Sequence, residues 1–218
     1  MRVELTDVSK GKGGIILDAT TLSFRTGEAT FARAETEQRP TVLGLIASGR
    51  MKPDTGTVRI DGAADNRAMR RHVALIDAPD VSEPASDVTV AGVVAEELMF
   101  AGRASHLFAV NRMLDELGLS SIARNAISTT PPTDRVRLLT ELAVLRKDVT
   151  GLVIVSPDRH GGNPLEWWTI ARKLAARDFA VLVIAGDASA TAINATAADP
   201  VSENATDELV PLFQKDWS

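Results

Sequence analysis

Three short runs of apolar residues recur along the chain, at 73–76, 152–155 and 180–185. They read VALI, LVIV and AVLVIA, so each contains β-branched side chains and no polar position. A strand that is apolar on both faces is typical of a parallel sheet with helices on both sides. The runs therefore predict the buried centre of an α/β fold.

Helical patterns fill the long interval between the first two runs. They cover 90–101, 108–117 and 134–146. Gly118 is expected to end the second helix, and Thr133 is expected to cap the third. The middle of the chain thus predicts a helical unit inserted between two strands.

The two ends of the chain differ from this centre. Residues 2–5 are strand-like, and the sequence KPDTGTVRIDG at 52–62 contains a turn. The stretch 188–218 is rich in Ala, Thr and Asp as far as Asp207, and apolar residues follow at 209–213. We expect one α/β domain over residues 1–187 and, over 188–218, a loosely ordered tail with one docking patch.

Charge and composition exclude several classes of function. The chain has 24 Lys and Arg against 29 Asp and Glu, a net charge of -5, and no basic block. A nucleic-acid partner is therefore not expected. The chain has no cysteine, and its three histidines, His72, His106 and His160, lack the spacing of metal ligands. We expect neither a metal nor a cofactor.

No stretch approaches the roughly 18 apolar residues of a membrane span, and the strand-like start has no signal-peptide core. Direct insertion into a membrane is not expected. The protein should be cytoplasmic, with any position at the inner face of the membrane held through a partner.

The order of these patterns resembles that of the ATP-binding cassette (ABC) ATPases. The similarity rests on the strand-like start, the turn at 52–62 and the sequence DVTV at 87–90, which opens the helical unit. It covers residues 1–187. It implies the P-loop NTPase-like α/β fold of an ABC ATPase, with an antiparallel β start, a parallel core sheet and a helical subdomain over about residues 80–146.

The phosphate-binding loop of that family, G-x-x-G-x-G-K-[ST], has no counterpart here. Residues 33–41 read RAETEQRPT and contain no glycine. A phosphate-binding loop curls its backbone so that successive N–H groups point at the phosphates, and glycines permit that conformation. On this resemblance the degenerate loop comprises Arg33, Glu35, Glu37, Gln38, Arg39 and Pro40.

The side chains of this loop also disfavour a nucleotide. Glu35 and Glu37 place negative charge where phosphates would lie. Arg39 stands for the lysine, and Pro40 stands for the magnesium-binding hydroxyl although it has neither a hydroxyl nor an N–H. Pro40 suits instead the first turn of a helix over 42–47.

The other nucleotide contacts implied by the resemblance fail as well. Ser156 and Pro157 stand where the family has its metal-binding Asp and its catalytic Glu, and Asp158 is expected to lie too late to replace them. The window 128–136 lacks the glycines of the signature motif, Gly186 replaces the switch histidine, and Asp77 replaces the glutamine of the Q-loop. The chain is therefore predicted not to be an enzyme.

A hydrolytic alternative uses the polar cluster at 158–163. Ser156 would be the nucleophile, His160 its base, and Asp158 or Asp187 the group that orients the base. Ser156 lacks the G-x-S-x-G context that exposes such a nucleophile. The other interpretation is a structural turn that packs at a dimer or partner surface.

Partner binding remains as a use for the fold. The candidate partner-binding residues are Glu96, Phe100, Phe108, Arg159, His160, Trp167 and Trp168. Adjacent helical residues point about 100° apart, so one ring of the Trp167–Trp168 pair is expected in the core and the other half exposed. The alternatives are an acidic solvated face at Glu96 and two core tryptophans.

These observations predict a catalytically inactive ABC ATPase-like protein that acts as an interaction or regulatory subunit of a membrane transport or cell-envelope system. Its partner would be a membrane permease-like protein or an ABC ATPase subunit, and a second copy of the chain is a further candidate. The alternative is a divergent ATP-binding subunit of an ABC transporter that shares a composite site with an active partner.

Overall fold

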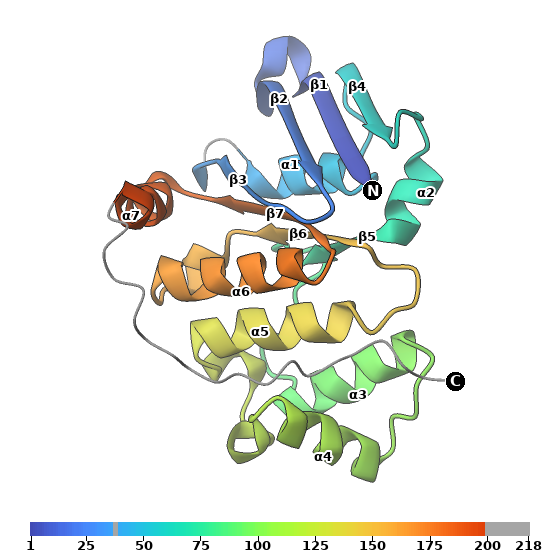
Figure 1. The fold of residues 1–218 in the computed structure, drawn as a ribbon, viewed down its shortest axis with the longest axis vertical. Helices are drawn as coiled ribbons and strands as arrows, with labels where there is room; N and C mark the ends of the chain where they lie inside the picture. The colour runs from blue at the N-terminus through green and yellow to red at the C-terminus, as the bar shows by residue number, and fades with distance from the viewer. Residues whose placement is uncertain (37–38, 199–218) are drawn as a thin grey trace.

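The computed structural model describes residues 1–36 and 39–198. Glu37, Gln38 and the apolar patch expected at 209–213 lie outside these residues. The chain forms two sheets with helices between and beyond them (Figure 1). In the described part, no helix combines the length and the apolar character needed to span a membrane.

The first sheet is antiparallel and has the strand order β2-β1-β4. Its strands are β1 (Arg2–Lys10), β2 (Leu17–Arg25) and β4 (Thr55–Ile60). Val3 and Leu5 alternate with more exposed neighbours along β1, which turns one face of this sheet towards the core. The antiparallel β start expected from the sequence is confirmed.

The second sheet is parallel and has the strand order β3-β7-β6-β5. Its strands are β3 (Ala29–Arg33), β5 (Val73–Ile76), β6 (Gly151–Val155) and β7 (Ala180–Ala185). Every residue of β5, β6 and β7 is buried, which confirms the strands expected from the three apolar runs. These strands are apolar on both faces because helices cover both faces.

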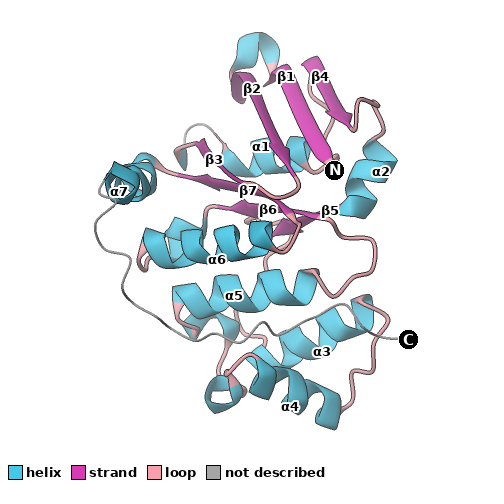
Figure 2. Ribbon diagram, viewed as in Figure 1, coloured by secondary structure: helices cyan, strands magenta, loops and turns pink. Residues whose placement is uncertain are grey.

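Helix α1 (Pro40–Ala47) lies between the two sheets, and α6 (Pro164–Ala176) covers the other face of the parallel sheet (Figure 1). Beyond α6 lie α5 (Pro132–Ala143), α3 (Val90–Phe100) and α4 (Leu107–Glu116), as Figure 2 shows. Helix α2 (Asn66–His72) joins β4 to β5. Helices α3 to α5 form the expected helical subdomain.

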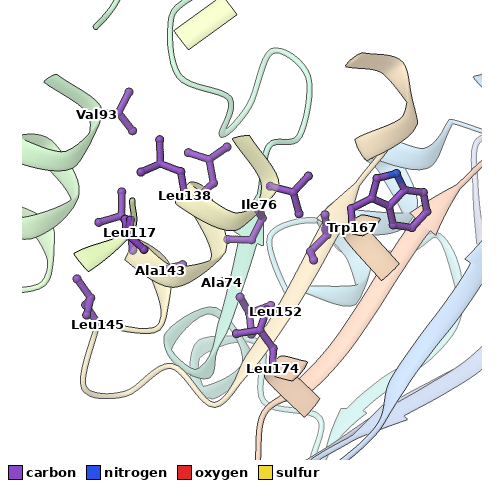
Figure 3. Close-up of a cluster of buried hydrophobic side chains, with 14 of the residues drawn as sticks. Ala74, Ile76, Val93, Leu117, Leu138, Ala143, Leu145, Leu152, Trp167 and Leu174 are labelled. Carbon is purple, nitrogen blue, oxygen red and sulfur yellow. The ribbon is translucent and has the colours of Figure 1, made fainter. Parts of the chain in front are cut away.

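A continuous core joins this subdomain to the parallel sheet. Figure 3 shows Ala74 and Leu152 of the sheet together with Leu138 of α5 and Leu117, which follows α4. Trp167 of α6 lies in the same cluster and is 1% exposed. The subdomain is therefore packed on the sheet through its side chains.

Two expectations about helix ends have opposite outcomes. Gly118 has a φ of 66° just after α4, which confirms it as the residue that ends this helix. The expectation that Thr133 caps the third helix is wrong, because α5 begins at Pro132 and places Thr133 in its first turn. The Thr133 hydroxyl donates to Glu166 Oε2 at 2.5 Å instead.

The expected tail is wrong over its first part. Residues 187–198 form helix α7 (Asp187–Ala198), in which Ala190 and Ile193 are buried. Six of its residues are alanine, the best helix former, and Asp187 favours the first turn. Helix propensity and two buried apolar contacts thus extend the ordered domain beyond residue 187.

Candidate functional site

A cavity of about 730 Å³ opens at the carboxyl edge of the parallel sheet. It lies between the segment that joins β3 to α1, the segment after β5, and the ends of β6 and β7. Its ionisable lining residues are Glu35, Arg39, Asp80, Asp158 and Arg159. Open α/β sheets bind their ligands at this edge, which makes the cavity the candidate site.

Glu35, which follows β3, binds the start of α7, which follows the neighbouring strand β7. Its Oε1 accepts a hydrogen bond from the backbone N–H of Asp187 at 2.5 Å. A Cβ atom at Gly186 would lie 2.8 Å from the same oxygen, so a side chain there would push the carboxylate aside. The carboxylate is stabilised by the positive end of the helix dipole.

Asp158 binds the same helix start from the opposite wall. Its Oδ2 accepts from the N–H of Gly186 at 2.8 Å and lies 3.3 Å from the Ser189 hydroxyl. The 3₁₀ helix η5 (Pro157–His160) places Asp158 in the lining of the cavity, and the expectation that it cannot replace the two carboxylates that the resemblance implies stays a prediction. Two carboxylates of the chain thus accept hydrogen bonds from the backbone amides of Gly186 and Asp187.

The segment before α1 differs from a glycine-rich nest. Arg39 adopts a left-handed conformation, with φ 51° and ψ 63°, and Pro40 begins α1 as the sequence predicts. Arg39 lines the cavity, whereas Arg33 Nε pairs with Asp187 Oδ1 at 3.0 Å. Because Pro40 has no backbone N–H, the start of this helix has one hydrogen-bond donor fewer.

The end of β6 presents an apolar side chain to α1. Val155 packs with Leu43 and Ile46 of that helix, and a Cβ atom at Gly44 would lie only 2.7 Å from Val155 Cγ2. The chain then leaves the strand at Ser156, with a φ of 47°, and Pro157 begins η5. The last β6 residue that faces α1 is thus Val155, one position before the pair that the resemblance assigned to the two carboxylates.

Asp77, at the end of β5, is the centre of a buried ionic cluster. Arg135 of α5 binds it with two nearly parallel hydrogen bonds, of 2.9 Å from Nε and 2.6 Å from Nη2. The side chains of Asp77 and Arg135 are 2% and 4% exposed. The cluster connects the strand end to the helical subdomain.

The pKa of Asp77 reflects opposing influences. Burial, the largest of them, raises the pKa, but the hydrogen bonds and charges of Arg135, His160 and Arg159 outweigh it and hold the pKa below its usual range. The Asp77 side chain is therefore a carboxylate at neutral pH.

Arg159 and His160 complete this cluster and are turned inward. Arg159 donates to the Asp77 carbonyl at 2.7 Å and to Glu83 Oε2 at 2.6 Å, and His160 Nε2 lies 3.0 Å from Asp77 Oδ2. These contacts do not support the prediction that both residues bind a partner, because they join Arg159 and His160 to other residues of the same chain. The hydrolytic triad is not assembled either, since His160 contacts Asp77 and not Ser156.

The other predicted partner residues divide by exposure. Phe100 and Phe108 are 60% and 82% exposed, and Glu96 is an exposed residue of α3. Trp167 is buried and cannot contact a partner, whereas Trp168 is half-buried with its ring edge towards Phe31 at 6.0 Å. The expectation of one core ring and one half-exposed ring is confirmed.

Metal ligation has no support in the described residues, where no group of three or more His, Asp and Glu side chains could hold a metal ion. The residues that sequence reasoning missed are Arg135 and Glu83, because their partners, Asp77 and Arg159, lie 58 and 76 positions away along the chain. A charged residue in an apolar helix face is the signal that could have identified Arg135.

Comparisons with known proteins agree on the fold. No family model and no curated protein matches the sequence. Solved structures do match, among them an ATP-binding subunit of an ABC transporter at 16% identity and a TM-score of 0.60, which covers 88% of this chain and 82% of that one. The fold is thus that of an ABC ATPase.

Two further structures support the same conclusion. One is a nucleotide-free ATP-binding cassette from an ABC transporter, at 16% identity and a TM-score of 0.62, covering 86% of this chain and 82% of that one. The other is a putative ABC transporter ATP-binding protein from Pyrococcus furiosus, at 12% identity and a TM-score of 0.60, covering 86% of this chain and 92% of that one.

Proposed function

We propose that the protein is a catalytically inactive ABC ATPase-like protein that acts as an interaction or regulatory subunit of a membrane transport or cell-envelope system. The observation that supports this most is the pair of carboxylates, Glu35 and Asp158, bound to the first amides of α7 inside the cavity. Each contact between like charges near a protein surface costs about 1 to 4 kcal/mol. A phosphate group in this cavity would lie close to both carboxylates.

The residues around the cavity support inactivity in a second way. A glycine-free loop precedes α1, and Ser156 and Pro157 follow β6 at the two positions where the resemblance implies the magnesium-binding and catalytic carboxylates. Hydrolysis requires the nucleotide, the metal and the attacking water to be held together. We therefore propose no enzymatic activity for this chain.

An exposed apolar surface supports a role in binding. It consists of Met99 and Phe100 at the end of α3 and Leu107 and Phe108 at the start of α4, all 59% to 82% exposed. Large apolar side chains that remain exposed on adjoining elements are candidates for an interaction site. We call these four residues the α3–α4 surface and propose that a permease-like membrane protein or an ABC ATPase subunit binds it.

The experiment that tests this role is a pull-down from solubilised membranes with the wild-type chain and with Phe108→Ala. We expect wild type to enrich a membrane protein or an ABC subunit, and the variant to lose about 2 kcal/mol of binding free energy or more. Ile15→Ala is the matched control, because Ile15 is 83% exposed and lies far from this surface in the sequence. Equal enrichment by Phe108→Ala and Ile15→Ala would contradict the proposed surface.

A divergent ATP-binding subunit that completes a site with an active partner is the second candidate. The observation that favours it is the cavity itself, which has the volume of a ligand site and includes Arg39 and Arg159. In that case Arg39 would bind a phosphate in spite of the two carboxylates, and Arg159 would have to leave its contacts with Asp77 and Glu83 to do the same. Nucleotide titration separates the two candidates.

A further inference from the structure

A second cavity, of about 420 Å³, opens at the opposite edge of the parallel sheet. It lies where β5 begins at Val73 and where Val149 precedes β6. The ends of α2 and α3 and the segment between α5 and β6 complete its walls. It shares no lining residue with the candidate site.

The lining of this cavity is strongly cationic. Among the residues that the structure describes, five of the lining residues carry a positive charge and one, Asp148, is acidic. The five are Arg50, Arg70, Arg71, Arg146 and Lys147. The chain as a whole has a net charge of -5, so this concentration of cations is opposite to the overall balance. We call it the basic cavity.

Few carboxylates of the described residues neutralise these cations. Arg146 pairs with Glu97 at 2.5 Å, but its Nε is buried without a hydrogen-bond partner. Within residues 1–36 and 39–198, the other four cations form no ion pair. The positive charge of the basic cavity is thus largely uncompensated there.

Backbone carbonyls hold two of these side chains in place. Arg50 Nη1 donates to the carbonyls of Val73 and Ser48 at 3.0 and 3.2 Å, and Arg70 Nη1 donates to the carbonyl of Gly49 at 2.9 Å. Burial and then the charges of Arg146 and Arg70 lower the pKa of Arg50. The guanidinium groups are therefore close together and oriented before any ligand binds, which reduces the entropy lost on binding.

We propose that the basic cavity binds a phosphate group. Guanidinium groups bind phosphate oxygens with paired, charge-assisted hydrogen bonds, and several oriented guanidinium groups suit a phosphate with more than one negative charge. The phosphate belongs to a soluble phosphorylated molecule or to a lipid headgroup. The second source is relevant because Phe100 lines the basic cavity and also belongs to the exposed α3–α4 surface.

The test titrates the full chain with inorganic pyrophosphate by calorimetry and, separately, measures co-sedimentation with phosphatidylcholine vesicles that contain or lack phosphatidic acid. Arg71→Gln/Lys147→Gln removes two exposed cations that form no ion pair, so this variant should remain folded, as circular dichroism would show. We expect it to weaken binding by about tenfold or more. The control Arg124→Gln/Arg172→Gln removes two other exposed arginines and should change binding less than about twofold.

Each outcome decides the proposal. Pyrophosphate binding that the double variant weakens supports a soluble ligand, and phosphatidic-acid-dependent sedimentation that it weakens supports a lipid headgroup. No binding of either probe overturns the proposal, as does equal binding by the double variant and its control. Loss of binding in Arg39→Gln alone would place the anion in the candidate site and would also overturn it.

Discussion

At the scale of single residues, the Asp77–Arg135 pair is the most deeply buried ion pair of the described residues. Both side chains are almost completely buried, and a buried charge without its partner is far less stable than a buried pair. The pair joins the end of β5 to α5, which belongs to the helical subdomain. It therefore fixes the subdomain relative to the strand ends that form the candidate site.

Asp77→Ala should lower the free energy of unfolding by about 3 to 5 kcal/mol, because it leaves the Arg135 guanidinium buried without its carboxylate. Urea unfolding measures this loss. The matched control is Asp77→Ala/Arg135→Met, which removes both charges and should recover a large part of the stability. A loss below about 1 kcal/mol in the single variant would contradict the structural role of the pair.

The carboxyl group of Asp77 also makes the free energy of unfolding depend on pH in acid. Because the pKa of Asp77 is lowered by folding, its contribution to stability is present above its unfolded pKa of about 3.9 and is lost as pH falls through the folded pKa. Urea midpoints between about pH 5 and about pH 2 should therefore fall less steeply for Asp77→Asn than for wild type. Equal slopes would show that Asp77 does not titrate differently in the two states.

Single residues also show where sequence reasoning stops. The sequence pattern placed Asp77 at the end of a strand. It also predicted that one ring of the Trp167–Trp168 pair is exposed, but it could not tell which one. It could not pair Asp77 with Arg135, 58 positions away, because that contact depends on how α5 packs. For the same reason it assigned Arg159 and His160 to a surface, although Asp77 draws both inward.

At the scale of elements, α1 and β6 are in unusually close contact. Gly44 lies in the interior of α1, where glycine normally costs about 1 kcal/mol relative to alanine. The structure gives the reason, since a Cβ atom there would lie 2.7 Å from Val155 Cγ2. Close packing between the helix and the strand outweighs helix propensity at this position.

Gly44→Ala should therefore destabilise the protein by about 1 to 3 kcal/mol, in spite of the better helix propensity of alanine. Thermal or urea unfolding measures the change. Adding Val155→Ala makes room for the new methyl group, so the double variant should be more stable than the sum of the two single changes predicts. A stabilising effect of Gly44→Ala alone would contradict the close packing.

The start of α7 allows a second test at this scale. Glu35→Ala removes a carboxylate that binds the Asp187 amide, so amide hydrogen exchange in α7 should become faster than in wild type. Asp87→Ala is the matched control, because Asp87 is exposed and lies at the start of the helical subdomain. If exchange in α7 is equally slow in both variants, Glu35 does not hold this helix.

Elements were predictable where their apolar pattern was unambiguous. The strands β5 and β7 match the predicted runs at both ends because a fully buried strand has no polar interruption. Helix α7 was missed because its Ala, Thr and Asp residues show little apolar periodicity, although Ser189, Ala190 and Ile193 are buried. Its start also contacts Glu35 and Asp158, which lie far away along the chain, and no local pattern reveals such contacts.

At the scale of the whole molecule, the fold and the site give different information. The layered arrangement of two sheets, α1 and the helical subdomain is that of an ABC ATPase. Fold alone does not establish function, which depends on the residues placed on it. Here the carboxylates of Glu35 and Asp158 line the cavity at the carboxyl edge of the parallel sheet, and the basic cavity lies at the opposite edge. We propose that the function of this protein is to bind a partner at the α3–α4 surface.

The central claim is that the cavity at the carboxyl edge does not hold a nucleotide, and calorimetric titration with Mg-ATP tests it most directly. The titration is done on wild type and on Arg71→Gln/Lys147→Gln, so that any binding in the basic cavity is separated from binding in the candidate site. We predict no binding to the double variant with a Kd below about 10 μM, or about -7 kcal/mol. Tighter binding to that variant, lost in Arg39→Gln, would contradict the account and favour the divergent ATP-binding subunit.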